Sequence, residues 1–238
     1  MNNQQAAAAV LRFWFEDCRP RQWFQQSDAF DGEVRSRFGP LTMEALAGQL
    51  TAWGEEPDSG LALVLLLDQF SRQLYRDQPE AFSGDAAALA LSRQALTCGW
   101  LSDEASRPRR QFWLMPFLHS ETLADLEEGI PLLERFSDPA TAAVARKNRE
   151  LLLRFGRYPH RNAALGRLST ADEESYLLTR HLPQCDCCGK AGPLHYRVRS
   201  DARPEWRLTC PECWEPISRQ PGYRYGGTRK ANRRQRKR

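Results

Sequence analysis

The chain of 238 residues has no apolar run long enough to cross a membrane, which excludes a helical membrane protein. No basic residue precedes the apolar stretch in Met1–Phe15, and Arg12 and Glu16 interrupt or close it, so it does not resemble a secretory signal. We therefore predict a cytoplasmic protein. Hydrophobic residues make up 41% of the chain, and its length allows one full domain with a small second one.

Cysteine is scarce outside one short segment. Five of the seven cysteines lie in Cys185–Cys213, and only Cys18 and Cys98 lie elsewhere. A disulfide framework would spread its cysteines through the fold, whereas this clustering is typical of metal binding in a reducing compartment. The cysteine pattern therefore predicts a metal site and agrees with a cytoplasmic location.

Acidic residues are absent from residues 219–238, which hold nine of the 34 basic residues. The other 218 residues therefore hold 25 bases against 30 acids. A mildly acidic body carries a strongly basic tail, which suggests a polyanionic partner for the tail and not for the body. Because a tail of this composition buries nothing, we expect residues 219–238 to be disordered when free.

No strand pattern occurs before residue 190, and most of residues 1–182 has the periodicity of helices. Capping signals at Ser27, Asp85 and Asp138 predict the starts of helices, because such side chains accept hydrogen bonds from exposed backbone N–H groups. About seven or eight helices result from this procedure. The sequence therefore predicts an all-α body.

The run Leu61–Leu67 is apolar on every side, as expected for a helix buried at the centre of a helical body. Antiparallel helix pairs around it would make a small solenoid or bundle. No helical-repeat consensus is present, so we expect any repeats to be structural and not visible in the sequence.

The character of the sequence changes after residue 182. Residues 194–199 alternate between apolar and polar side chains, which predicts a half-buried strand. Trp206–Thr209 predicts a second strand, and residues 200–204 form the turn between them. The predicted segments are a helical body at 1–182, a small zinc ribbon built on a β hairpin at 183–218 and a disordered basic tail at 219–238.

Two Cys-x-x-Cys pairs flank this hairpin, Cys185 with Cys188 and Cys210 with Cys213. Each pair can supply two thiolates to a tetrahedral zinc ion, and the gap between the pairs is near that of zinc ribbons. Gly189 suits the turn after the first pair, where a positive φ is often needed. We predict a structural Zn²⁺ held by these four cysteines and no catalytic metal, since four thiolates leave no open position.

Two neighbouring residues are left out of the predicted zinc site. Cys187 would replace Cys185 or Cys188 only with poorer spacing, so we interpret it as a spare thiol. His195 falls on the polar side of its strand, which predicts a surface residue and not a metal ligand.

Polar side chains are embedded in apolar sequence at three places in the helical body. Asp68 directly follows the most apolar helix, and a buried carboxylate without a partner is costly. Arg72 lies one helical turn later and can pair with it, as can arginines from farther along the chain. The candidate residues are Asp68, His119, Glu121 and His160 for catalysis, and Arg72, Arg157, Arg161, Asn162 and Arg167 for ligand binding.

At these residues the chain resembles a bacterial family called domain of unknown function 924. Similar phrases occur at Phe13-Trp14-Phe15, Trp23-Phe24, Asp68-Gln69-Phe70-x-Arg72, Pro116-Phe117-x-His119-Ser120-Glu121 and Phe155-Gly156-Arg157-Tyr158-Pro159-His160-Arg161-Asn162. The resemblance runs from about Val10 to Leu178. It implies an all-helical, tetratricopeptide-like fold and no assigned activity. The ribbon and the basic tail depart from the family's usual extent and look like an added module.

The polar residues of the body allow two main interpretations. A structural network of Asp, Arg and His would lock the helices together, and loss of Asp68 should then be strongly destabilising. In a ligand cleft, the side chains of Arg157, Arg161 and Arg167 would hold an anion. His119 or His160 would then act as acid or base. We predict from the sequence that Arg161→Ala is tolerated, because arginines around an empty cleft repel one another. A metal site made by the four catalytic candidates is a weaker variant.

Three functions fit the sequence. The first is a binding protein, in which the ribbon and tail contact RNA, DNA or a ribonucleoprotein. Arg and Lys side chains would contact the phosphates, and aromatic side chains would stack on the nucleobases. The second is an enzyme acting on a small anionic substrate in a helical cleft, and the third is a protein–protein adaptor that uses the concave face of stacked helices. A merely nonspecific basic end is equally compatible, because charge alone carries no sequence information. The residues predicted to contact nucleic acid are Arg224, Arg229, Lys230, Arg233, Arg234, Arg236, Lys237 and Arg238, with Tyr223, Tyr225 and Trp214 for stacking.

Overall fold

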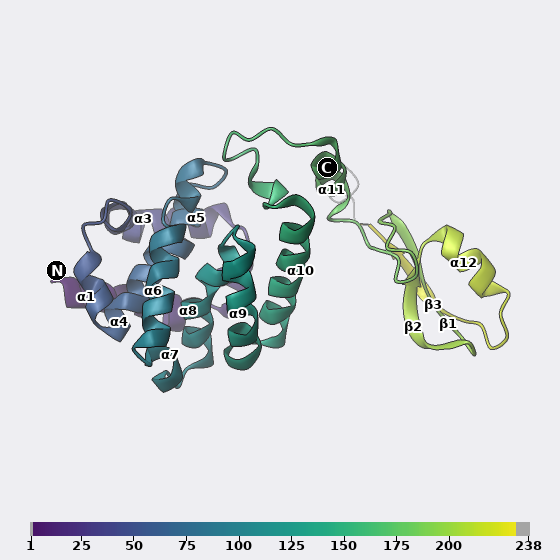
Figure 1. Ribbon diagram of the computed structural model, residues 1–238, viewed down its shortest axis with the longest axis horizontal. Coiled ribbons are helices and arrows are strands. Elements are labelled where there is room, and N and C mark those ends of the chain that lie inside the picture. The colour runs from purple at the N-terminus through teal and green to yellow at the C-terminus, as the bar shows by residue number, and fades with distance from the viewer. Residues whose placement is uncertain (1, 232–238) are drawn as a thin grey trace. The chain divides into compact units, whose positions relative to one another are not determined.

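The computed structural model describes residues 2–231 and divides the chain into two compact units, Met1–Leu168 and Ser169–Arg238 (Figure 1). We call them the helical unit and the C-terminal unit, and each is described by itself. The sequence predicts a boundary after residue 182, whereas the structure divides the chain after Leu168. Helix α11, Ala171–Thr179, therefore belongs to the predicted helical body but to the C-terminal unit of the structure. Within the described residues, no helix combines the length and the apolar character that a membrane span requires.

Two of the three predicted capping residues, Ser27 and Asp138, cap their helices, whereas Asp85 is the first residue of its helix and the cap position is Gly84. Ser27 Oγ accepts a hydrogen bond from the N–H of Phe30, and Asp138 Oδ1 accepts from the N–H groups of Ala140 and Thr141. Bonds of this kind satisfy donors that have no partner within the helix. The α-helices described in the helical unit are α1 Asn3–Arg12, α2 Pro20–Phe24, α3 Asp28–Leu46, α4 Pro57–Val64, α5 Ser71–Leu74, α6 Asp85–Thr97, α7 Trp100–Asp103, α8 Arg107–His119, α9 Leu123–Phe136 and α10 Pro139–Phe155.

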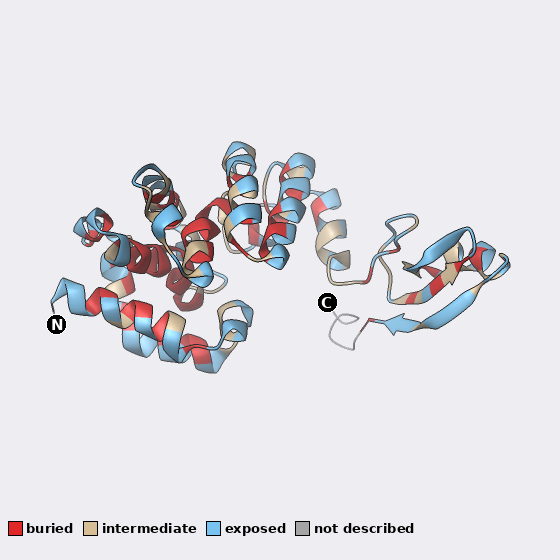
Figure 2. Cartoon of the chain, turned by 90° about the horizontal axis from the view of Figure 1, so that it is seen from below, coloured by how far each residue is buried: buried red, intermediate tan, exposed pale blue. Residues whose placement is uncertain are grey.

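The most apolar run of the sequence forms the centre of the helical unit. Helix α4 passes directly into a turn of π-helix, Leu65–Phe70, and α5 continues from it. Every residue from 61 to 70 is buried. Figure 2 shows buried segments, coloured red, inside the helical unit. Helix α4 contacts α1, α6 and α8, and the π-helical turn contacts α3. The polar residues at the end of this run are therefore held inside a packed interior.

Helices α6, α8, α9 and α10 stand side by side in the helical unit (Figure 1). Helix α8 contacts α6 and α9, and α9 contacts α10. Gly129 permits the close approach of α9 to α8, because a Cβ at this position would lie 2.5 Å from Cβ of Phe117. A bulkier residue there would force the two helices apart.

An aromatic cluster covers another side of the central run. The ring of Phe70 lies 5.3 Å from that of Trp14 and 5.3 Å from that of Phe38, centroid to centroid, and Trp14 lies 5.4 Å from Phe112. Aromatic pairs at such distances add to the stability gained by burial. The Phe13-Trp14-Phe15 phrase therefore belongs to the core of the fold.

The C-terminal unit contains a three-stranded antiparallel sheet in the order β2-β1-β3. Its elements are β1 Leu194–Ser200, β2 Arg203–Thr209, α12 Pro211–Ser218 and β3 Arg224–Lys230. The predicted hairpin is confirmed, and its strands extend further than expected, because Ser200 already pairs with Arg203 across a two-residue turn. Helix α12 packs on one face of the sheet, where the ring of Trp214 lies 4.8 Å from that of Tyr196.

The prediction of a disordered tail is wrong for residues 224–230, which form β3 and pair with β1 from Leu194 to Arg199. Composition misled here because strand pairing uses backbone groups, which basic side chains on an exposed strand do not block. The rest of the predicted tail, with Arg233, Arg234, Arg236, Lys237 and Arg238, lies outside the described residues.

The prediction that His195 lies on the surface is also wrong, because its side chain is completely buried. The chain returning from the first cysteine pair covers it. The carbonyl of Lys190 lies 3.4 Å from Nε2, and a Cβ at Gly192 would lie 3.7 Å from Cε1 of the ring. Alternation along a strand indicates which face a residue occupies, but it does not show that a loop closes over that face.

Candidate functional sites

Asp68 is completely buried in the π-helical turn, and donors surround its carboxylate. His119, the last residue of α8, places Nδ1 2.7 Å from Oδ1, and Nη1 of Arg72 lies 3.2 Å from the same oxygen. Gln69 Nε2 donates to Oδ2 at 2.5 Å. The buried charge is therefore compensated, which removes most of the cost of its burial.

The pair of Asp68 and His119 has a defined protonation state. Burial by itself would raise the pKa of Asp68, but His119, Arg72 and Gln69 outweigh it and hold that pKa well below its usual range. Burial lowers the pKa of His119 and outweighs the opposite effect of Asp68. A carboxylate can only accept, so Nδ1 of a neutral His119 carries the proton and Nε2 is an acceptor. Among the described residues, Nε2 has no hydrogen-bond partner.

Two arginines share a second carboxylate beside this pair. Nη2 of Arg72 lies 2.8 Å from Oδ1 of Asp85, and Nη1 of Arg161 lies 3.1 Å from Oδ2. Arg161 also donates from Nη2 to the carbonyl of His119 at 2.7 Å, and its guanidinium lies 4.5 Å from the ring centroid of Phe82. Asp68 and Asp85 thus balance the charges of Arg72 and Arg161.

Glu121 ties the segment after α10 to the start of α9. Its Oε1 accepts from the N–H of Tyr158 at 2.6 Å, and its oxygens accept from Nη1 and Nη2 of Arg167 at 2.9 and 3.0 Å. Burial would raise the pKa of Glu121, but the hydrogen bonds from Arg167 and Tyr158 outweigh it and lower that pKa. This bidentate pair has the geometry of a strong ionic contact.

The other candidates of the helical unit surround these two groups. Arg157 donates from Nη2 to the carbonyl of Leu168 at 2.8 Å, and the ring of His160 stacks on Tyr158 at a centroid distance of 5.5 Å. Asn162 is buried, and its carbonyl accepts from the N–H of Arg167 at 2.8 Å.

Because Arg72, Arg161 and Arg167 each have a carboxylate partner, this geometry favours a structural network over an open anion cleft. The ligand atoms of the four catalytic candidates do not converge as a metal site, since the metal-binding group found among residues 2–231 is the cysteine cluster.

The four cysteines predicted as metal ligands come together in the C-terminal unit. The Sγ atoms of Cys185, Cys188, Cys210 and Cys213 all lie within 4.8 Å of one another, and those of Cys188 and Cys210 are 3.8 Å apart. A tetrahedral zinc–thiolate site with bonds of about 2.3 Å has sulfur–sulfur edges of about 3.8 Å. Four converging thiols of this spacing can hold a metal ion.

The turn that presents the first cysteine pair is built by backbone contacts. Gly189 has φ of 71°, as its position predicts, and its N–H donates to the carbonyl of Cys185. Burial would raise the pKa of Cys185, but hydrogen bonds from backbone N–H groups, first that of Cys210, lower it to about 6. Cys187 stands apart from the cluster, where its Sγ accepts a hydrogen bond from Arg203 at 3.2 Å.

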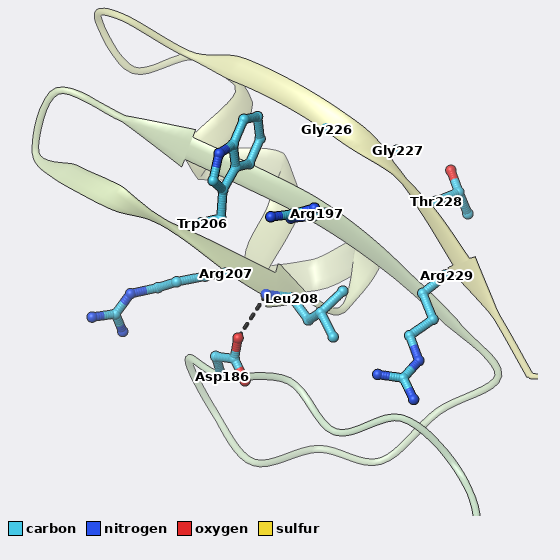
Figure 3. Close-up of a pocket in the computed structure, with 9 residues that line it drawn as sticks. All are labelled: Asp186, Arg197, Trp206, Arg207, Leu208, Gly226, Gly227, Thr228 and Arg229. Atoms are coloured by element: carbon cyan, nitrogen blue, oxygen red, sulfur yellow. Dashed lines mark hydrogen bonds between the residues drawn. The ribbon is translucent and has the colours of Figure 1, made fainter.

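The face of the sheet opposite α12 is open and basic. An open depression of about 450 Å³ on this face is lined by Arg197 and Arg229, with Trp206 at its side (Figure 3). Asp186 also lines this depression, and its carboxylate accepts a hydrogen bond from the N–H of Leu208 at 2.7 Å. Figure 3 shows a helix behind the sheet and Trp206 and Arg197 in front of it.

The arginines on this face differ from most of those in the helical unit. Within residues 2–231, no carboxylate lies within 4.0 Å of Arg197, Arg199 or Arg229. Arg197 and Arg199 instead lie 5.1 and 5.0 Å from the ring centroid of Trp206. These guanidinium groups are therefore held in place without being neutralised.

The sequence matches two family models. That of a bacterial protein of unknown function (DUF924) matches residues 10–180. The chain belongs to the DUF924 family. It is also similar to the solved structure of a protein of unknown function, ATU0120, from Agrobacterium tumefaciens. The identity is 32%, the match covers 74% of this chain and 98% of that one, and the TM-score is 0.69. A model for a domain of unknown function (DUF8622) matches residues 183–232. No curated protein matches the sequence.

The DUF924 match ends before the cysteine cluster and the sheet, so these belong to the part that DUF8622 covers. Within the DUF924 part, the phrases around Asp68, His119 and Arg161 come together at the buried network. The predicted resemblance over the helical body is therefore confirmed. The family carries no activity in its description.

Sequence reasoning missed several residues of both sites. Asp85 is the carboxylate shared by Arg72 and Arg161, yet the sequence indicates it only as a helix start. On the sheet, Trp206 joins Arg197 and Arg199, whereas Trp214 instead donates from Nε1 to the hydroxyl of Tyr223. The signal for the sheet cluster was present, because residues two apart on a strand share a face.

Proposed function

We propose that this protein binds nucleic acid through the open sheet face of its C-terminal unit, with the helical unit as a scaffold. The observation that supports this proposal best is the set of arginines on that face without carboxylate partners, among them Arg197, Arg199 and Arg229. Phosphate groups are the natural partners of exposed guanidinium groups, which bind their oxygens in a fork.

The charge of the unit agrees with this partner. Residues 183–231 contain nine bases and five acids, and residues 232–238 add five bases and no acid. Three residues predicted for phosphate contact, Arg224, Arg229 and Lys230, lie exposed on β3. A basic surface of this kind attracts a polyanion and releases counterions on binding.

Zn²⁺ is the metal ion that the cysteine cluster suits best. Four thiolates in a tetrahedron are typical of structural zinc, and such an ion would stabilise the small C-terminal unit, whose core is limited. The ion would tie Cys185 and Cys188 to Cys210 and Cys213, which flank β1 and β2. Its role in this proposal is to hold the sheet in shape.

The test compares two matched double variants of the full chain. Arg197→Gln with Arg199→Gln removes two charges from the sheet face, and Arg19→Gln with Arg21→Gln removes two exposed charges from the helical unit. Binding of a labelled mixed-sequence oligonucleotide is measured by anisotropy at several salt concentrations. The sheet variant should bind about tenfold more weakly or worse and show a smaller salt slope, while the control binds normally. Equal loss in both variants, or no binding by the wild type, would reject the proposal.

A second candidate is an enzyme acting on a small anionic substrate in the helical unit. The observation that favours it is the pair of Asp68 and His119, in which Nδ1 is oriented by a carboxylate and Nε2 has no partner among the described residues. This is the arrangement of a general base. A thermal-shift screen with small carboxylates and phosphates tests it. A ligand must stabilise wild type but not His119→Gln, and a screen without such a ligand rejects it.

The side-by-side packing of α6, α8, α9 and α10 is compatible with a tetratricopeptide-like arrangement of the helical unit. A protein partner on such a scaffold, as an adaptor would have, stays a prediction.

A further inference from the structure

Trp206 occupies a special position on the open sheet face. It starts from β2 and reaches across β1 towards β3 (Figure 3). A Cβ at Gly226 in β3 would lie 2.6 Å from Cζ3 of the indole, so only glycine leaves room for the ring there. Trp206 as a whole residue is still 39% exposed, although it carries a large apolar side chain. An aromatic ring that is held in one position and left exposed can serve as a surface on which a flat ligand stacks.

Two guanidinium groups extend this aromatic surface. Those of Arg197 and Arg199 lie at cation–π distance from the ring, and the three side chains form what we call the Trp206 cluster. Both indole rings and flat guanidinium groups stack on nucleobases. Arg229 lines the depression beside the cluster, and Arg224 pairs with Arg199 across the sheet, so both can meet the phosphates of a strand whose base stacks there.

We propose that the Trp206 cluster binds single-stranded nucleic acid by stacking on a nucleobase, while the surrounding arginines contact the backbone. This inference rests on the proposed nucleic-acid binding and adds the form of the ligand. In a duplex the bases are stacked on each other and paired, so the flat aromatic surface finds no free base face. A single strand offers its bases and its phosphates together. The opposite face of the sheet does not compete, because α12 covers it.

The experiment uses the full chain with zinc and three labelled probes of equal length. These are a single-stranded oligonucleotide, the same sequence as a duplex, and a strand of abasic sugar phosphates. Wild type should bind the single strand about tenfold more tightly than the abasic strand, which is the order expected for one stacked base. The abasic probe needs no variant, so this comparison holds even where a substitution disturbs folding.

Three variants then locate the contact. Trp206→Leu should lower the affinity for the single strand by about tenfold and leave the affinity for the duplex within about twofold, because only base stacking is lost. Trp206→Phe, which keeps an aromatic ring, should retain most of the single-strand affinity. Phe24→Leu, at an exposed aromatic residue of the helical unit, should change neither.

The outcomes distinguish base stacking on the Trp206 cluster from the broader proposal that the open sheet face binds nucleic acid. Equal affinity for the single, duplex and abasic probes, unchanged in Trp206→Leu, would overturn base stacking and leave a purely electrostatic nucleic-acid surface. Equal binding of a polyglutamate peptide would show a nonspecific polyanion site and overturn the inference. Absence of binding to every probe would overturn both.

Discussion

The Nδ1 atom of His119 lies 2.7 Å from Oδ1 of Asp68, and this contact joins the end of α8 to the central π-helical turn. An asparagine at position 68 would place its NH₂ group against a donor, because His119, Arg72 and Gln69 all donate to the carboxylate. We therefore predict that Asp68→Asn destabilises the helical unit by about 3–5 kcal/mol, the cost of breaking a buried ion pair. The measurement is the urea midpoint with the m-value checked. Asp28→Asn, an exposed position in α3, is the control. A midpoint equal to that of wild type would refute the structural role of Asp68.

Arg161 distinguishes a network from an empty cleft. Its side chain is only 6% exposed, and it bonds to Asp85 and to the carbonyl of His119. The sequence led us to expect that Arg161→Ala is tolerated, but these contacts reverse that expectation: we now predict that it destabilises the unit by about 1–3 kcal/mol, because the acceptors lose a charged donor. Urea unfolding of Arg161→Ala and of Arg19→Ala, at an exposed arginine, makes the comparison. Wild-type or higher stability of Arg161→Ala would support a cleft whose arginines await an anion.

The buried pair predicts loss of stability in acid. The pKa of Asp68 and that of His119 are both lowered in the folded state. A lowered pKa gives stability that is complete above the unfolded value and is lost as the pH falls, from about 6.5 for His119 and about 3.9 for Asp68. The urea midpoint of wild type should therefore fall between pH 7 and pH 5.

The control for this prediction is His119→Gln, which cannot titrate but keeps a donor for Asp68. Its midpoint should fall less over the same pH range than that of wild type. Parallel pH profiles of the two proteins would show that His119 does not control this loss.

The cysteine cluster predicts about one zinc ion per chain. Serine at Cys185, Cys188, Cys210 or Cys213 should lower the zinc content measured by atomic emission, while Cys187→Ser should keep it, since Cys187 lies outside the cluster. Chelation should unfold the C-terminal unit and leave the transition of the helical unit nearly unchanged. Loss of metal in Cys187→Ser, or full metal content in Cys210→Ser, would contradict the ligand assignment.

Local signals in the sequence predicted much of the fold. The caps at Ser27 and Asp138 act within a few residues, and the ligand pairs at Cys185 and Cys210 act through fixed short spacing. The apolar run from Leu61 needs only its own composition to indicate burial. Features of this kind can be predicted because the interacting groups are close neighbours in the chain.

Long-range partners could not be predicted in the same way. Asp85 pairs with Arg161 over 76 residues, and β3 pairs with β1 although its sequence is basic and rich in glycine. Burial of His195 depends on a loop that closes over the sheet. Each of these depends on how distant segments pack, which periodicity along one segment does not encode.

Hydrogen–deuterium exchange of the full chain with a saturating single-stranded oligonucleotide tests the central claim most directly. The claim is that the open sheet face of the C-terminal unit is the nucleic-acid site. Binding should slow exchange in β1, Leu194–Ser200, and β2, Arg203–Thr209, and leave α1–α10 unchanged. Slowed exchange confined to the helical unit, or none in a complex shown to be saturated, would contradict it.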